Sequence, residues 1–162
     1  MIRNAHNLSN EEMSSLNPDS ALAALLVFTG WTALHVILLA VLERFPQTLS
    51  GEKQAHQFAK SRTYGETTLV GRIACHHQNC LENLPLFAAV VLVNAHVTSN
   101  SGSLAAGSSH SIDREAWFYV YSRILQGLVH WYKVNHTFAV IRFLFFGTGF
   151  TLLFVMGFKT FG

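Results

Sequence analysis

The sequence predicts an all-α integral membrane protein, an up-down four-helix bundle within a single domain covering residues 1–162. Half of the residues are hydrophobic and 12% are charged, whereas about 25% of the residues in soluble domains are charged. The hydrophobic residues fall into four blocks, at about 20–42, 67–97, 114–132 and 136–161. Residues 21–42 include no Lys, Arg, Asp or Glu, and this run exceeds the roughly 20 helical residues that a hydrocarbon core requires.

The segments between the blocks indicate how the helices are oriented. Residues 43–66 are polar, contain Pro46 and Gly51, and carry four basic side chains, whereas residues 98–112 carry none. Because Lys and Arg concentrate in cytoplasmic loops, we expect 43–66 to be a cytoplasmic loop and both termini to be non-cytoplasmic. The third connection is a tight turn at Lys133, and short connections favour antiparallel neighbouring helices.

Composition and cysteine placement argue against several classes of protein. The net charge of +2 is small and scattered, so we expect no nucleic-acid partner. Cys75 and Cys80 would point about 140° apart around a helix and cannot pair with each other. Residues 1–20 lack the apolar core of a secretory signal, so the first spanning helix is expected to act as the membrane signal.

Polar side chains gather on one face of the second predicted helix. Polar groups in a spanning helix are costly, about 2.5 to 3.5 kcal/mol for a central charge, so their default interpretation is functional. At 100° per residue, six of them fall within a sector of about 120°: Arg72, Cys75, His76, Asn79, Glu82 and Asn83. His77 and Gln78 lie outside this sector. The clustering predicts a lined binding site.

The third and fourth blocks add polar groups expected at a similar depth. In the third block a stripe spaced four, three and four residues apart comprises Tyr119, Arg123, Gln126 and His130. Arg142 stands alone among apolar residues in the fourth block. Three arginines and one carboxylate leave surplus positive charge, which predicts an anionic ligand with carboxylates or a thiolate.

The same residues can also be interpreted as structural polar groups or as ligands of a haem or a metal ion. Buried polar groups also join membrane helices without any ligand, for around 0.6 kcal/mol each, and this role is expected of four histidines taken singly: His35, His96, His110 and His136. A haem would need two facing histidines, for which His76 or His77 with His130 is the available pairing. A zinc site from His76 and Cys80 lacks a third and fourth ligand. We therefore expect no metal and no haem.

The motifs resemble the family of membrane-associated proteins in eicosanoid and glutathione metabolism, the MAPEG family. In the second block, Arg72 precedes a run similar to the family's His-x-Asn-x-x-Glu and Pro-x-Phe signature, namely His77-Gln-Asn79-Cys-Leu-Glu82-Asn83-Leu-Pro85-Leu-Phe87. The third block is similar in Ser122-Arg123-Ile-Leu-Gln126-Gly-Leu-Val-His130. The resemblance spans residues 20–161.

This resemblance implies a homotrimer that binds glutathione between subunits, near the cytoplasmic side. Arg72, Asn79 and Glu82 would hold glutathione, Arg123 matches the third-helix arginine, and Arg142 resembles the arginine that steadies the thiolate. Arg142 and Arg123 are the expected catalytic residues. The glutathione-binding residues are expected to be Arg72, His76, Asn79, Glu82, Asn83, Gln126 and His130.

The implied activity is that of a membrane-bound glutathione transferase or peroxidase acting on lipophilic electrophiles or lipid hydroperoxides, with glutathione as co-substrate. Two departures from the family favour a broad detoxifying enzyme over a particular eicosanoid synthase. Cys75 replaces a frequent arginine, and Gln126 and His130 stand where eicosanoid-forming members carry Tyr or His. The alternative is a non-catalytic lipid- or glutathione-binding scaffold of the same fold. Either protein would contact membrane lipids, in the endoplasmic reticulum or a bacterial inner membrane.

Overall fold

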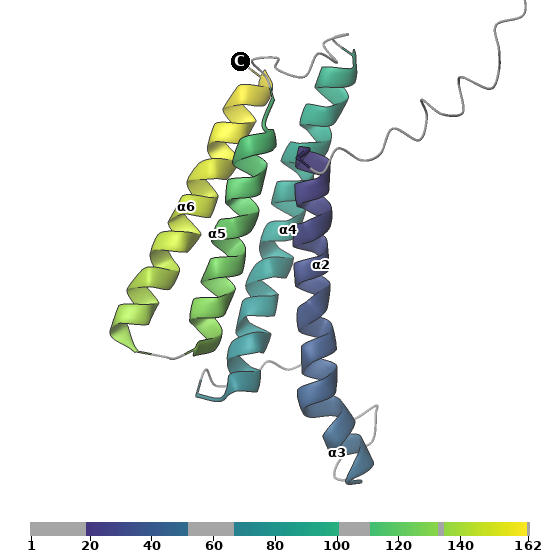
Figure 1. Cartoon of the computed structure of the whole chain (residues 1–162), viewed down its shortest axis with the longest axis vertical. Helices are drawn as coiled ribbons and strands as arrows, with labels where there is room; N and C mark the ends of the chain where they lie inside the picture. The colour runs from purple at the N-terminus through teal and green to yellow at the C-terminus, as the bar shows by residue number, and fades with distance from the viewer. Residues whose placement is uncertain (1–18, 52–66, 101–110, 133–134, 162) are drawn as a thin grey trace, which may run out of the picture.

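Four long helices pack side by side in alternating directions (Figure 1). The computed structural model describes residues 19–51, 67–100, 111–132 and 135–161. Within them lie α2 (Ala21–Leu39), α4 (Leu69–Asn100), α5 (Asp113–Tyr132) and α6 (His136–Phe161), and no strand occurs in these ranges. The start of α2 and the end of α6 lie at the same end of the bundle. The predicted all-α, up-down four-helix fold is confirmed.

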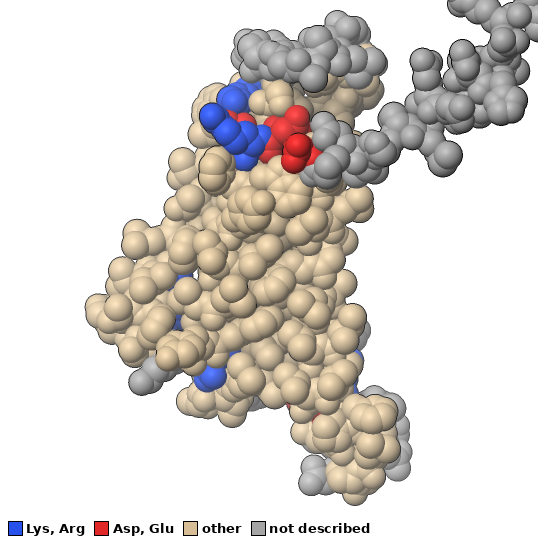
Figure 2. Space-filling model, viewed as in Figure 1, with Lys and Arg blue, Asp and Glu red and all other residues tan. Residues whose placement is uncertain are grey.

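Three stretches of helix are long and apolar enough to cross a membrane. They are Ala21–Leu49, Leu69–Ser99 and His136–Phe161. Leucine, valine and phenylalanine side chains project outward from them, as at Leu26 and Phe143. Figure 2 shows a group of charged side chains near the end that holds the start of α2 and the end of α6, a few more toward the opposite end, and a largely uncharged surface between them.

The remaining long helix, α5, has a more polar sequence than the other three. It directs its polar face into the bundle. Glu115, Ser122, Arg123 and Gln126 are all buried there. A bundle surrounded by lipid satisfies its polar groups internally. The polar stripe predicted for the third block is therefore an interior feature of the fold.

The first helical stretch continues past the predicted end at residue 42. After α2, a π-helical turn η1 (Ala40–Arg44) leads into α3 (Phe45–Leu49). Pro46, within the predicted polar connection, is the second residue of α3 and follows the π-helical turn, so the chain stays helical through a residue that lacks a backbone N–H. Gly51, at φ +74°, follows the helix in the left-handed region that favours glycine. The rest of the predicted loop, including Lys53, Lys60 and Arg62, lies outside the described residues, as do His110 and Lys133.

An aromatic cluster joins three of the helices. Phe87 of α4 stacks on Tyr119 of α5 with ring centroids 4.3 Å apart, and Phe28 of α2 packs edge-on against both rings. All three side chains are fully buried. Offset-stacked and edge-to-face pairs are the preferred aromatic arrangements. This cluster fixes how α2, α4 and α5 meet next to the polar residues of the site.

Candidate functional site

A buried hydrogen-bond network links α5 to α4. Arg123, only 1% exposed, donates from Nη2 to Asn83 Oδ1 at 2.8 Å and from Nη1 to Gln126 Oε1 at 2.9 Å. Asn83 in turn donates to Asn79 Oδ1 at 2.9 Å. The guanidinium also lies 5.1 Å from the Tyr119 ring centroid. Among the described residues no carboxylate pairs with Arg123, so the network holds a buried cation with neutral partners.

Arg142 of α6 reaches across to His130 of α5. The distance from Arg142 Nη1 to His130 Nδ1 is 2.7 Å. A guanidinium can only donate, so His130 accepts through Nδ1. Both side chains are half-buried. This contact places a cation at the end of the bundle where α5 gives way to α6.

Arg72 lies at the same end of the bundle, near the start of α4. Its Nε donates to the carbonyl oxygen of Trp131 at 3.0 Å, and its Nη1 donates to that of Thr67 at 3.2 Å. The first bond ties α4 to the last turn of α5. Arg72 is half-buried.

Glu82 faces outward from α4. It is exposed and accepts a hydrogen bond from Gln78 Nε2 at 2.7 Å. Asn79, on the adjoining part of the helix, is half-buried. Within one chain, no described arginine forms an ion pair with Glu82. An exposed carboxylate inside a spanning helix needs a partner from outside the chain, since lipid offers none.

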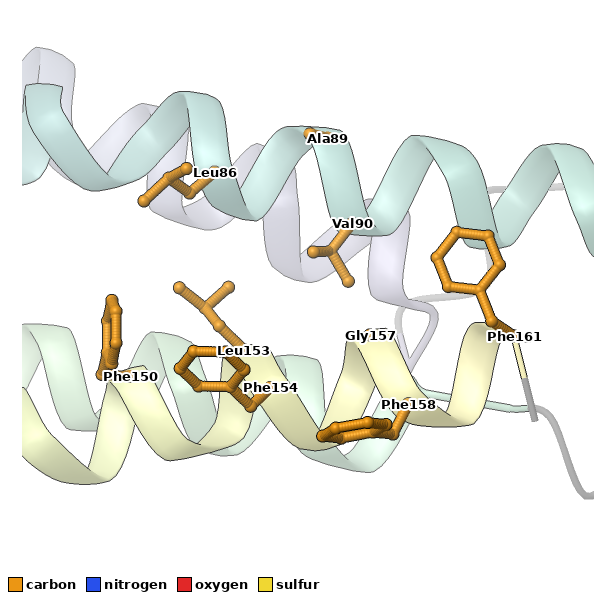
Figure 3. A pocket seen from close by; sticks show the side chains of 9 residues that line it. All are labelled: Leu86, Ala89, Val90, Phe150, Leu153, Phe154, Gly157, Phe158 and Phe161. Atoms are coloured by element: carbon orange, nitrogen blue, oxygen red, sulfur yellow. The ribbon is translucent and has the colours of Figure 1, made fainter.

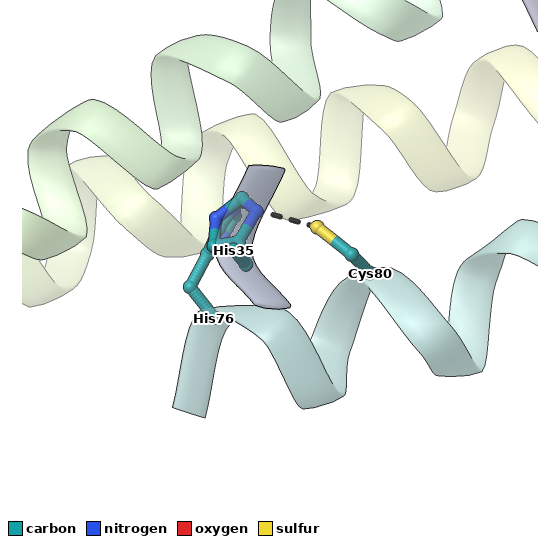
Figure 4. A group of neighbouring side chains, drawn as sticks. All are labelled: His35, His76 and Cys80. Carbon is teal, nitrogen blue, oxygen red and sulfur yellow. Dashed lines mark hydrogen bonds between the residues drawn. The ribbon is translucent and has the colours of Figure 1, made fainter. Parts of the chain in front are cut away.

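His76 departs from the rest of the predicted set. It is 1% exposed and points into the bundle toward His35 of α2 and Cys80 of α4, as Figure 4 shows. Its Nε2 lies 3.4 Å from Cys80 Sγ, and its ring is 5.0 Å from that of His35. His35 was expected to have a structural role only. Its place beside the second helix depends on the rotation of α2, which the weakly polar α2 sequence does not indicate.

The predicted site residues thus form four groups in one chain. Buried inside are Arg123, Asn83 and Gln126. His76 is buried against His35 and Cys80, and its ring centroid lies 6.0 Å from that of His130. Half-buried at the end of the bundle are Arg72, His130 and Arg142. On the outer face of α4 are Asn79 and Glu82. Cys75, whose role the sequence left unexplained, is half-buried.

Comparison with known families shows which family the chain belongs to. The model of the MAPEG family matches residues 21–162, which cover all four long helices. The chain belongs to the MAPEG family. No curated protein and no solved structure matches it. Membership and the apolar helices make this a membrane protein of the class concerned with eicosanoid and glutathione metabolism.

In this MAPEG protein, Gly127 of α5 allows a close approach between helices. A Cβ at this position would lie 2.5 Å from His76 Nε2 and 2.9 Å from Trp31 Cζ2. We expect Gly127→Ala to lower the free energy of unfolding by about 1 to 3 kcal/mol, the usual cost of overpacking. Thermal unfolding in detergent measures this. Gly30→Ala is the control, because a Cβ there meets nothing within 4 Å, and equal losses in both variants would contradict the packing argument.

Proposed function

We propose that the protein is a membrane-bound glutathione transferase or peroxidase that acts on lipophilic electrophiles or lipid hydroperoxides. The observation that carries the proposal is the separation of charge within one chain. The exposed carboxylate of Glu82 lies on a spanning helix and forms no ion pair with a described arginine, whereas the guanidinium groups of Arg123 and Arg142 contact neutral side chains. Glutathione has an ammonium group for the carboxylate, and two carboxylates and a thiol for the cations.

The outer face of α4 is the proposed contact surface for glutathione. Glu82 would accept from the α-amino group, Asn79 would bond the peptide, and Arg72 would bind a carboxylate. Because Glu82 faces away from its own bundle, the arginines that complete the site would come from a neighbouring copy. This fits the homotrimer that the family resemblance implies. The proposed role of Asn83, Gln126 and Arg123 is to position the outer face of α4 through their hydrogen bonds inside the bundle.

Arg142 is the proposed activator of the thiol. A free thiol with a pKa of about 8.5 is only a few per cent ionised at neutral pH, and the thiolate is the nucleophile. A nearby guanidinium stabilises the thiolate and so lowers the pKa of the bound thiol. His130 holds the Arg142 guanidinium through the 2.7 Å contact. The thiolate then forms a C–S bond with the electrophile, which loses a leaving group or takes up a proton after addition. With a hydroperoxide, the thiolate attacks the terminal oxygen, the O–O bond breaks, and the lipid alcohol leaves after protonation. A second glutathione then converts the resulting sulfenic acid to glutathione disulfide and water.

An apolar groove between α4 and α6 offers a place for a lipophilic substrate (Figure 3). Its volume is about 670 Å³, and Leu86, Val90 and Phe154 are among the residues that line it. Leu86 follows Glu82 by one helical turn, so the two share a face of α4. The groove therefore begins beside the proposed glutathione surface and opens toward the lipid.

The test combines binding and turnover by the full chain purified in detergent. Added glutathione should give the ultraviolet difference signal of a thiolate at neutral pH, and the protein should conjugate a generic electrophile or reduce a lipid hydroperoxide. Absence of both the thiolate signal and turnover would overturn the proposal. Glutathione binding without turnover would indicate the non-catalytic scaffold instead.

Glu82→Gln tests the role of the carboxylate. We expect KM for glutathione to rise roughly 10- to 100-fold, because a hydrogen bond to a charged group contributes about 1.5 to 3 kcal/mol. Gln78→Leu is the matched control, since it removes the observed partner of Glu82 without removing the charge. Steady-state kinetics with varied glutathione measure both variants. An unchanged KM in Glu82→Gln would exclude Glu82 from the binding surface.

A further inference from the structure

Three potential metal ligands lie together inside the bundle, apart from the proposed glutathione surface. They are His35 of α2 and, one turn apart on α4, His76 and Cys80 (Figure 4). Their ligand atoms all lie within 4.8 Å of one another, and each residue is at most 2% exposed. Only His76 and Cys80 were recognised in the sequence, and the structure supplies the third ligand that was lacking.

His35 is oriented as a metal-binding histidine is. Its Nδ1 lies 2.7 Å from the carbonyl oxygen of Trp31, and a carbonyl can only accept, so Nδ1 carries the proton. In the neutral ring Nε2 therefore has a free lone pair. That atom is buried and has no hydrogen-bond partner among the described residues. Metal-binding histidines are commonly fixed in this way, with the second ring nitrogen donating to a backbone carbonyl.

Two donors, the Trp31 indole and the Cys80 thiol, compete for the lone pair on Nε2 of His76. His76 Nε2 lies 3.4 Å from Cys80 Sγ and also 3.4 Å from Trp31 Nε1, which only donates. One lone pair cannot accept well from both an indole and a thiol. A metal ion would replace the thiol proton and join Sγ to Nε2, at the cost of the long Trp31 bond. The observed Sγ to Nε2 distance of 3.4 Å is near the roughly 3.7 Å expected for two ligands of a three-coordinate ion with metal bonds of about 2.0 and 2.3 Å. The three ligand atoms lie within 4.8 Å of one another, so small side-chain shifts would close the site around an ion.

We propose that His35, His76 and Cys80 form a three-coordinate site for a monovalent copper ion. Thiolate is a soft ligand that favours Cu(I), and imidazole also suits copper. Two neutral imidazoles and one thiolate carry a single negative charge, which Cu(I) neutralises. A divalent ion would leave a net positive charge in this interior, which already encloses the buried cation Arg123.

The site is separate from the proposed glutathione reaction, and its test does not depend on that activity. The full chain in detergent is titrated anaerobically with Cu(I), in glutathione-free buffer, against a chromogenic Cu(I) chelator. We expect one Cu(I) per chain to be held against the chelator. Cys80→Ser and His35→Gln should lose this retention. Cys75→Ser and His96→Gln, which lie on α4 outside the cluster, should keep it.

X-ray absorption at the copper edge of the wild-type protein gives a second measurement that needs no variant. One sulfur and two nitrogen ligands are expected. Failure of the wild-type protein to retain Cu(I), or equal retention by Cys80→Ser, would overturn the site. Preferential binding of Zn²⁺ over Cu(I) at equal concentration, lost in the same two variants, would overturn the assignment to copper.

Discussion

Replacing Arg142 with methionine is expected to lower kcat/KM for glutathione conjugation by about 10²- to 10³-fold. Loss of one fixed hydrogen-bond donor that stabilises negative charge in an active site usually lowers the rate by about this factor. Arg142 is held against His130 at 2.7 Å, so its guanidinium is positioned before substrate binds. Methionine keeps much of the side-chain length without the charge. The thiolate difference signal of bound glutathione should fall with the rate.

Two further results define the role of Arg142. Arg142→Lys keeps the charge but not the forked donors, so it should retain more of the thiolate signal than Arg142→Met. His130→Leu removes the group that holds the guanidinium and should reduce kcat/KM less than loss of Arg142 itself. Full thiolate formation in Arg142→Met would show that another group activates the thiol.

Replacing Arg123 with methionine is expected to weaken both the fold and glutathione binding. Arg123 donates to the buried side chains of Asn83 and Gln126. Without it their two oxygens lose a donor, and each buried unsatisfied group costs about 1 to 3 kcal/mol. Asn83 also holds Asn79, so KM for glutathione should rise together with the loss of thermal stability. Thermal unfolding in detergent and steady-state kinetics measure the two effects.

A double-mutant cycle with Asn83→Leu separates this network from simple loss of packing. The two side chains bond each other at 2.8 Å, so their losses should be clearly non-additive. Asn83→Leu alone leaves the cation without one of its partners, and adding Arg123→Met removes that cation. Additive losses of unfolding temperature would contradict a shared network.

Hydrophobicity predicted the helices better than it predicted where they end. An uncharged, apolar run such as 21–42 is long enough to cross a membrane. Within lipid its backbone must be helical, because lipid offers no hydrogen-bond partner for backbone groups. The first helix was expected to end at residue 42 and to be followed by the polar connection 43–66. The chain instead widens to a π-helical turn in Ala40–Arg44 and continues as α3, with Pro46 as its second residue. Such local adjustment depends on backbone geometry that composition does not reveal.

Helical periodicity placed the polar residues of α4 and α5 on common faces, and the Arg123 contact with Asn83 agrees with that expectation. Periodicity cannot say how each helix is rotated against its neighbours. That rotation directs His76 to the interior and Glu82 to the outer face of the same helix. It also brings His35 to His76 and Cys80, across more than 40 residues of sequence.

The sequence by itself determined the four-helix membrane fold, the family and the surplus of arginines over carboxylates on the predicted polar faces, because these follow from composition, period and motif along single helices. Only the tertiary structure decided which polar groups meet. It enclosed Arg123 with neutral partners, left Glu82 outward, and built the cluster of His35, His76 and Cys80. The reason is that contacts between helices depend on their mutual rotation and depth, which packing of side chains such as Phe28, Phe87 and Tyr119 sets.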